Sequence, residues 1–288
     1  MAIDYEKLKS FQLDDIEHDV TPRDVMLYAL GLSLGNEPTN PGQLRFLYED
    51  GLEALPTIGS VFGYPGFWIK EHPELGIDWK TILNGEQGIE IFRPLPVSGK
   101  VIGRTRIERV VDKGPGKNAV LHTVRDVTSA ETGELLCRVT NAVVSRGAGG
   151  FGGPNDQDKN QSAKPTGAPD VSVDLTALPQ AALIYRLSGD YNPLHADPKV
   201  ATEAGFPMPI LHGAATWGMV GYALLTKLCG DDPARFKRFS ARFTSPVFPG
   251  ETVTTEVWKT GEGEAVFRAR VAERDVTVLD NGSFSYKA

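Results

Sequence analysis

Residues 212–230, HGAATWGMVGYALLTKLCG, decide the fold of the second half of the chain. Apart from a few polar residues this stretch is apolar on every side of a helix, and such a helix belongs in a protein core. Residues 252–288 follow it with many β-branched residues and with turn signals at 261–263 and 280–282. A buried helix followed by a run of strands predicts a curved antiparallel sheet wrapped around that helix, which is an α+β fold.

The first half carries a similar strand-rich run at residues 101–146. Turn clusters at 113–116 and 131–134 divide it, which predicts three antiparallel strands joined by hairpins. Phe92 precedes Gly99 by seven residues, as Phe243 precedes Gly250, and both pairs are offset by 151 residues (243 − 92 and 250 − 99). The repeated order of a helix-like segment and then strands predicts a duplicated unit. The alternative is a coincidence between two proline-containing strand turns.

Residues 145–170, SRGAGGFGGPNDQDKNQSAKPTGAPD, differ in composition from the rest of the chain. They are rich in Gly, Pro, Asn, Asp and Ser and cannot bury enough apolar surface to fold alone. We therefore expect a first repeat over residues 1–150, a linker over residues 151–170 and a second repeat over residues 171–288.

The composition restricts the classes of partner. There are 30 Lys and Arg residues against 37 Asp and Glu, a net charge of −7, which argues against nucleic acid or an acidic membrane surface as a partner. Cys137 and Cys229 are the only cysteines, so a disulfide framework is not expected and a reducing compartment is. The sequence shows no signal-peptide pattern, no Ser-Lys-Leu carboxyl end and no membrane-spanning apolar run. These observations predict a soluble, cytoplasmic protein.

The chemistry-bearing residues gather in residues 185–195, YRLSGDYNPLH. Its turn-forming residues exclude a continuous helix or strand, so Asp190 and His195 are expected on one shaped loop. A carboxylate and an imidazole placed together can share a water molecule, one accepting its proton while the other orients it. The alternative is purely structural, because Asp and Asn in such loops often form Asx turns and a histidine there is often a hydrogen-bond donor.

A second element favours the chemical interpretation. Residues 209–213, PILHG, immediately precede the apolar helix, so the Gly213 amide is expected at its first turn. Amides there lack intrahelical acceptors and can stabilise a developing oxyanion such as a thioester enolate. We expect His212 to be a capping or packing residue.

The motifs GDYNPLH, HADPKVATEAGF and PILHG resemble the hydratase 2 motif of the MaoC-like dehydratase family. LRFLYEDGLEALPTIG, ILNGEQGIEIFRPLPVSGKV and RFTSPVFPGETV are also similar to segments of two-repeat hydratase 2 domains, so the resemblance covers nearly the whole chain. It implies a double hot-dog fold, in which each repeat has a curved antiparallel sheet around a central helix. The implied activity is (R)-specific hydration of trans-2-enoyl-CoA to (3R)-3-hydroxyacyl-CoA.

The resemblance also implies roles for individual residues. Asp190 and His195 would hold and activate water, Asn192 would position that pair or the substrate, and the Gly213 amide would bind the thioester oxygen. Family positions that touch substrate or CoA, or lie at the active site, carry over to Glu49, Asn84, Gly85, Lys113 and Phe243. The chain departs from its relatives at Asn84, where they usually have histidine, so an imidazole contact to CoA is lost. For Glu49 and Lys113 surface roles remain open, and Phe243 suits both the core and a pocket wall.

The first half lacks the Asp…His pair and the His-Gly step, so one active site is expected for two repeats. A half without catalytic groups could widen the substrate tunnel, and Gly59, Gly63 and Gly66 fit that idea or flexible loops. No zinc or dinucleotide motif is present, so the expected partner is an enoyl-CoA thioester, with no metal and no further cofactor. By family likeness a homodimer is plausible. A hot-dog thioesterase and a non-catalytic acyl-CoA binding protein are the alternatives.

Overall fold

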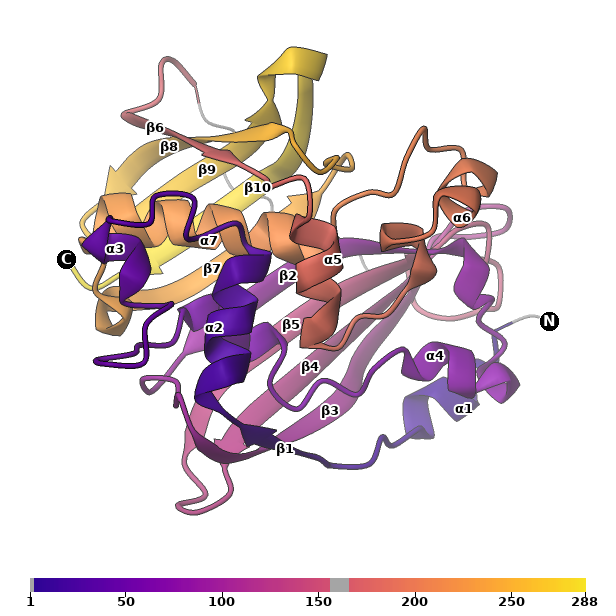
Figure 1. The fold of residues 1–288 in the computed structure, drawn as a ribbon. Coiled ribbons are helices and arrows are strands. Elements are labelled where there is room, and N and C mark those ends of the chain that lie inside the picture. The colour runs from indigo at the N-terminus through magenta and orange to yellow at the C-terminus, as the bar shows by residue number, and fades with distance from the viewer. Residues whose placement is uncertain (1–2, 156–165) are drawn as a thin grey trace.

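The described residues of the computed structural model, 3–155 and 166–288, contain one antiparallel sheet of ten strands (Figure 1). In spatial order the strands run β1-β3-β4-β5-β2-β7-β10-β9-β8-β6. The first half contributes β1 (Ile16–Val20), β2 (Ile82–Ile91), β3 (Gly99–Asp112), β4 (Ala119–Ser129) and β5 (Leu135–Ser145). The second half contributes β6 (Val171–Thr176), β7 (Phe236–Phe243), β8 (Thr252–Gly261), β9 (Glu264–Val271) and β10 (Val276–Tyr286).

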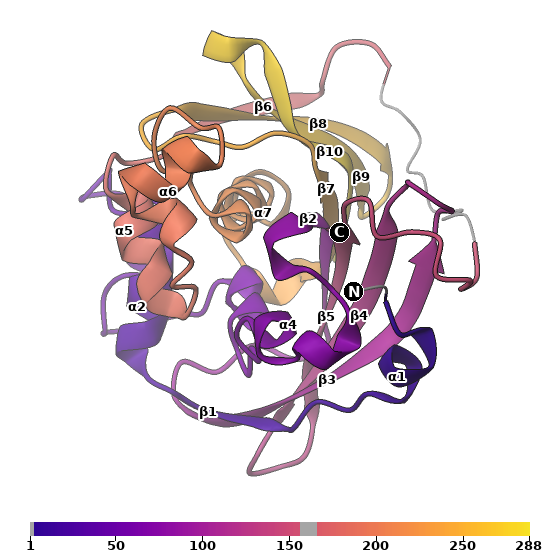
Figure 2. The same ribbon diagram turned by 90° about the vertical axis from the view of Figure 1, so that its right-hand side faces the viewer.

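Helices cover the concave side of this sheet. The α-helices are α1 (Tyr5–Ser10), α2 (Pro22–Gly31), α3 (Pro41–Leu44), α4 (Trp68–Glu71), α5 (Ala181–Tyr185), α6 (Pro198–Glu203) and α7 (Gly213–Cys229). Short 3₁₀ turns are η1 (Pro56–Ser60), η2 (Pro73–Leu75), η3 (Trp79–Thr81), η4 (Arg186–Ser188), η5 (Pro193–His195), η6 (Pro233–Arg235) and η7 (Ala272–Arg274). Figure 2 shows α7 nearly end-on inside the curved sheet, with α2, α5 and α6 on the open side.

The two halves are related by a local two-fold repeat, which supports duplication over coincidence. The strand order is symmetric about the β2–β7 junction. On one side β5, β4, β3 and β1 follow β2, and on the other β10, β9, β8 and β6 follow β7. The register at the junction agrees with the offset of 151. Gly88 pairs with Ser240 and Ile89 with Phe239, and shifting 88 and 89 by 151 gives 239 and 240.

The long apolar stretch forms α7, as its sequence predicts. Trp217 is completely buried, with its ring 4.5 Å from that of Phe239 on the sheet. Gly221 allows close packing, because an added Cβ would lie 2.5 Å from the Thr57 methyl carbon. The helix ends at Gly230, whose left-handed backbone (φ 62°) is the usual C-terminal cap. Burial of α7 against the sheet therefore forms the main core.

The described residues of the first half form no long central helix, so that detail of the expected repeat is wrong. Between α3 and β2 the chain forms only η1, α4, η2 and η3, each of three to five residues. The physical reason is composition, because glycine and proline disfavour helix interiors. The residues concerned are Pro56, Gly59, Gly63, Pro65, Gly66, Pro73 and Gly76. The sheet of the first half is covered here by loops.

The hairpins of the first half lie where the sequence predicts them, but one turn predicted for the second half is wrong. Residues 280–282 do not end a strand, since β10 continues from Val276 to Tyr286. Asn281 has a positive φ of 54° and the register shifts there, so this asparagine-glycine pair forms a β-bulge. The actual reversal between β9 and β10 uses η7 and Asp275, which also has a positive φ.

The start of the expected linker is tied to the first half. The Asp112 carboxylate accepts hydrogen bonds from the amides of Gly114, Gly150 and Gly152, so the glycine-rich segment folds back on the β3–β4 turn. These bonds outweigh the cost of burying the carboxylate and hold the pKa of Asp112 below its usual value. Residues 156–165 of the expected linker lie outside the described residues, and β6 begins at Val171.

Among the helices described, none is long and apolar enough to span a membrane.

Candidate active site

The loop that carries Asp190 and His195 is shaped by its own polar side chains. Gly189 ends η4 with a φ of 111°, a conformation that residues with a Cβ rarely adopt. The Asp190 carboxylate then accepts a hydrogen bond from the Asn192 amide at 3.2 Å. The Asn192 side chain accepts one from the Leu194 amide at 3.1 Å and so caps η5, which ends at His195. Asn192 therefore positions His195 through the backbone.

Backbone carbonyls fix the proton positions on two neighbouring histidines. His195 Nδ1 lies 2.9 Å from the Ile210 carbonyl oxygen, and His212 Nε2 lies 3.1 Å from the Asp190 carbonyl oxygen. A carbonyl oxygen can only accept, so each of these nitrogens must carry the proton. The lone pair of neutral His195 is consequently on Nε2, where it can accept a proton from water. This hydrogen bond of His212 holds residues 209–213 against the Asp190 loop. It is a structural role, in line with the packing role expected of His212.

The environment keeps both imidazoles neutral. Their rings stack with centroids 3.7 Å apart, and both residues are buried. Burial lowers the pKa of His195, while its bond to Ile210 and the nearby Asp190 charge oppose that shift. Burial and the adjacent His195 also lower the pKa of His212. His195 is thus available at neutral pH as a general base.

Gly213 places its amide at the start of α7, beside this histidine pair. His212 precedes the helix without a capping side-chain bond, and the first amides of a helix have no intrahelical acceptor. An added Cβ on Gly213 would lie 3.2 Å from Phe243 Cε1, so Phe243 packs directly over this glycine. The arrangement offers a backbone donor at the positive end of a long helix dipole.

A cavity of about 140 Å³ extends from this site into the first half. Tyr185, Ser188, Asp190 and Ala214 line it from the second half. The opposite wall comes from residues 60–69 and from β2 to β5. Its residues are Ser60, Val61, Tyr64, Pro65, Gly66, Phe67, Trp68, Ile69, Ile82, Asn84, Gln87, Thr105, Thr123, Arg125, Asn141 and Val143. The space lies where the first half has loops in place of a central helix.

Among the expected site residues, the structure brings Asp190, Asn192, His195, Gly213 and Phe243 together at one place. Asn84 lines the cavity, and Gly85 lies at a register shift in β2 where an added Cβ would be 3.0 Å from the Ala142 carbonyl oxygen. Lys113 lies in the β3–β4 turn, at the same end of the sheet as Asn84 but outside the cavity wall.

The structure does not place Glu49 at the site either. It is exposed and lies outside the cavity wall. Its neighbour Arg45 binds the Asp231 carbonyl, beyond the end of α7 that is opposite Gly213. The expectation relied on a matching position in a motif, whereas the fold sends this segment toward the far end of the helix.

Sequence reasoning missed the polar residues that the first half contributes to the cavity. Arg125 and Thr123 of β4 lie among inward-facing Ala119, Leu121 and Val127. The signal was available, because alternate residues of a strand share a face and this face is otherwise apolar. Gln87, Thr105 and Asn141 on the adjacent strands complete this polar part of the wall.

Among the described residues, Asp190, His195 and His212 also form a group that could hold a metal ion, since one donor atom of each lies within 4.8 Å of the others. Two imidazoles and a carboxylate are known zinc ligands. However, the two rings are inclined by only 27° and stacked, so their in-plane lone pairs run side by side. A metal needs converging lone pairs, and this geometry therefore favours a shared water molecule.

The fold and the site of the described residues together define a double hot-dog protein with one loop carrying Asp190 and His195 beside the cavity. Family comparisons agree, because a MaoC like domain matches residues 160–281 and an MFE-2 hydratase 2 N-terminal domain matches residues 18–147. The chain belongs to the MaoC-like dehydratase family, in its two-repeat hydratase 2 form.

Individual relatives support this assignment over the full chain. The chain is 41% identical to 3-hydroxyacyl-thioester dehydratase Y of Mycobacterium tuberculosis, with 93% of each chain covered. It is 37% identical to the peroxisomal enoyl-CoA hydratase 2 of Arabidopsis thaliana, covering 94% of this chain and 92% of the other. A crystal structure of a MaoC-like dehydratase from Phytophthora capsici superposes with a TM-score of 0.87 at 31% identity, covering 99% and 98% of the two chains.

Proposed function

We propose that this protein is a hydro-lyase that reversibly hydrates trans-2-enoyl-CoA to (3R)-3-hydroxyacyl-CoA. The observation that carries the proposal is the fixed tautomer of His195, which leaves Nε2 as a proton acceptor close to Asp190 and to the start of α7. The assignment agrees with the relatives named as enoyl-CoA hydratases.

In the hydration direction, Asp190 and His195 Nε2 hold one water molecule. The water loses a proton to this pair as its oxygen forms a bond to C3 of the enoyl thioester. The C2–C3 π electrons move toward the thioester, and the Gly213 amide stabilises the negative charge on its oxygen. C2 then takes a proton from the same pair, so water has been added and the site is restored. Burial contributes by keeping His195 neutral before the reaction.

The CoA moiety would enter at the end of the cavity marked by Asn84, which is exposed. Asn84 and Gly85 would contact the pantetheine arm, and Lys113 in the nearby turn would attract the negatively charged CoA phosphates. Phe243 would form the wall beside the thioester, because it packs over Gly213.

The direct test is product analysis with crotonyl-CoA and a medium-chain trans-2-enoyl-CoA. We expect chiral chromatography to show a single 3-hydroxyacyl-CoA enantiomer, since a pinned thioester oxygen and a fixed water allow attack on one face. A coupled dehydrogenase specific for the (3S) alcohol should give no NADH. Strong NADH formation would contradict the (3R) assignment. Release of free CoA thiol without the alcohol would indicate a thioesterase, and tight binding without turnover would indicate an acyl-CoA binding protein.

The cellular setting of this activity is part of the proposal. We place the reaction in acyl-CoA degradation of the β-oxidation type and in the cytoplasm, where the free, buried Cys137 and Cys229 suit a reducing environment. We also propose a homodimer, which would cover some of the exposed apolar side chains of the second half, such as Leu183, Leu187, Tyr191 and Met208. Cell fractionation and sedimentation test these points, with a peroxisomal fraction or a monomer as the contrary results.

A further inference from the structure

Arg125 lies inside the cavity in an unusual position for a charged residue. It is in the middle of β4, paired with Thr105 on one side and Val139 on the other, and only 3% of its surface is exposed. Strand residues alternate between the two faces of a sheet, so Arg125 points to the cavity side and Asp126 to the other side.

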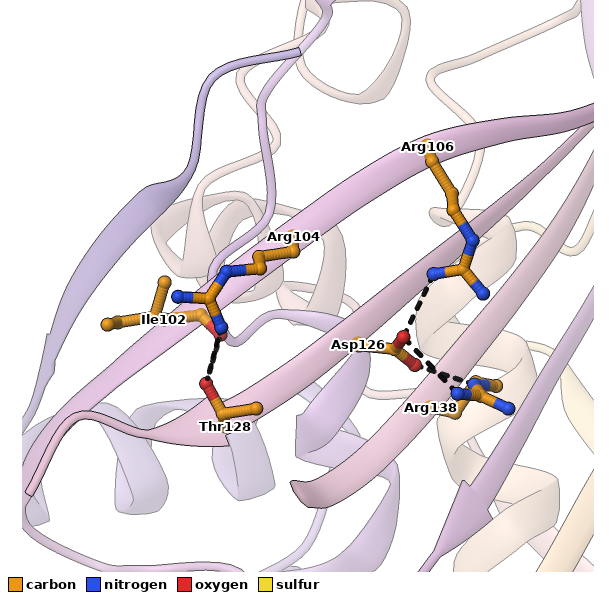
Figure 3. A network of polar contacts seen from close by, with 6 residues as sticks. All are labelled: Ile102, Arg104, Arg106, Asp126, Thr128 and Arg138. Atoms are coloured by element: carbon orange, nitrogen blue, oxygen red, sulfur yellow. Dashed lines mark hydrogen bonds and ion pairs between the residues drawn. The ribbon is translucent and has the colours of Figure 1, made fainter. Parts of the chain in front are cut away.

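The arginines on the outer face show how this protein normally pairs a guanidinium. Figure 3 shows Arg106 and Arg138 both reaching Asp126, at 2.9 and 2.6 Å. These three residues come from β3, β5 and β4 and form an ion-pair network on the surface of the sheet. The one acidic residue of β4, Asp126, therefore lies on the face opposite to that of Arg125.

Arg125 has no such anionic partner among the described residues. One of its terminal nitrogens donates to the Ser60 carbonyl, and its guanidinium lies 5.4 Å from the centre of the Tyr64 ring. Its Nε is buried without a hydrogen-bond partner. Burial lowers the pKa of Arg125 to about 10, so the side chain is still charged at neutral pH. A buried charge without a counter-ion is costly, and this one faces a cavity that can admit a ligand.

The surroundings of Arg125 are also polar. Gln87, Asn141 and Thr123 form one cross-strand row on the cavity wall, and the Thr105 hydroxyl beside Arg125 is buried without a partner. In the second half the equivalent strand, β9, turns buried Ala265, Phe267 and Ala269 inward. A hydrocarbon chain would bind better to an apolar wall like that of β9 than to the polar wall around Arg125.

We propose that the acyl group hydrated by this protein carries a carboxylate at its distal end, which pairs with Arg125 inside the cavity. The substrate class is then an ω-carboxy-trans-2-enoyl-CoA, the mono-CoA thioester of an unsaturated dicarboxylic acid. The inference rests on the proposed function, because it uses Asp190 and Gly213 to place the thioester end. The CoA phosphates do not fit this role, since Arg125 is buried whereas Asn84 lies at the exposed end.

The test compares two substrate series of graded chain length, one ending in a carboxylate and the other in a methyl group. For the wild type we expect the higher kcat/KM with a carboxylate at one or more lengths. Arg125→Met keeps much of the side-chain volume but removes the charge, and should lower kcat/KM for that substrate about tenfold to hundredfold. Turnover of the methyl-ended series should fall clearly less than that of the carboxylate-ended series, because no charged contact to the substrate is lost there. Arg125→Lys should retain part of the preference.

Arg106→Met is the matched control, because it removes an arginine from the outer face of the same sheet. It should leave the ratio between the two substrate series unchanged. The proposal is overturned if the wild type favours methyl-ended chains at every length, or if Arg125→Met lowers both series equally, which would assign Arg125 to holding the Ser60 loop. Failure of the wild type and of Arg106→Met to hydrate any enoyl-CoA would overturn the proposed function itself.

Discussion

At the scale of single residues, the site depends on backbone groups that set the protonation of its histidines. Because Nδ1 of His195 donates to the Ile210 carbonyl, the basic nitrogen can only be Nε2. In the proposed mechanism the carboxylate of Asp190 and this imidazole act on one water, so we expect neither to be sufficient alone.

We expect Asp190→Asn and His195→Ala each to lower kcat at least ~10²-fold, the usual effect of losing a general acid or base. The double variant should be little slower than either single variant, because the two residues act as a unit. Steady-state kinetics on folded protein tests this, with Asp197→Asn as the control. Asp197 is an exposed carboxylate that caps α6 nearby, and asparagine caps equally well. Near-normal turnover in both single variants would refute the assignment.

The pH dependence follows from the direction of the pKa shift of His195. Burial lowers that pKa from 6.5, and only the neutral imidazole can accept a proton. As pH falls, activity should therefore be retained through pH 6.5 and be lost only below it. A profile of kcat/KM against pH measures this limb for the free enzyme. A midpoint at or above pH 6.5 would show that the base is not a buried His195 with a lowered pKa.

At the scale of elements, α7 is constrained by close packing more than by helix propensity. Propensity alone would make Gly221→Ala stabilising by about 1 kcal/mol. However, the new Cβ would lie 2.5 Å from the methyl carbon of buried Thr57, whose branched side chain has little freedom to move. Overpacking typically costs about 1–3 kcal/mol, so we expect net destabilisation in chemical denaturation. Gly261→Ala, with nothing within 4 Å of the new Cβ, is the control. A more stable Gly221→Ala variant would contradict this packing.

The sequence predicted those elements whose signals are local. The apolar run of α7, the hairpins of the first half and the Asp190–His195 loop all follow from composition and turn residues over short windows. The bulge at Asn281 was interpreted as a turn, because an asparagine with positive φ serves both. Whether the strand continues there depends on Gly282 packing against Phe267, which is a contact between strands.

The polar cavity could not be predicted in the same way. The inward direction of Arg125 follows from the alternation of β4, but that this face borders a cavity becomes clear only when the pairing of β4 with β3 and β5 is known. The missing helix of the first half is a property of a whole segment, and it creates the space that Arg125 faces. Glu49 was expected at the site from a matching motif position, whereas the structure gives it an exposed position outside the cavity wall.

At the scale of the whole molecule, the two halves depend on each other for both structure and function. The loop that carries Asp190 and His195 is in the second half, whereas much of the cavity wall is in the first. α7 of the second half contacts Thr57 of η1, and β2 and β7 join the two sets of strands into one sheet. Each half alone would expose one of these strands as a new edge.

We therefore expect residues 1–155 expressed alone to aggregate or to melt without cooperativity. The unpaired edge of β2 would expose backbone donors and acceptors along a ladder that runs from Glu86 to Glu90 in the complete chain. The loss of α7 would also uncover the apolar side chains around η1. Circular dichroism melting and size-exclusion chromatography measure both effects. Co-expression with residues 156–288 is the decisive control, because β7 can then pair with β2 and rebuild the cavity. The co-expressed halves should elute together and hydrate enoyl-CoA, whereas a well-folded, cooperatively melting first half on its own would show that the β2–β7 junction is dispensable.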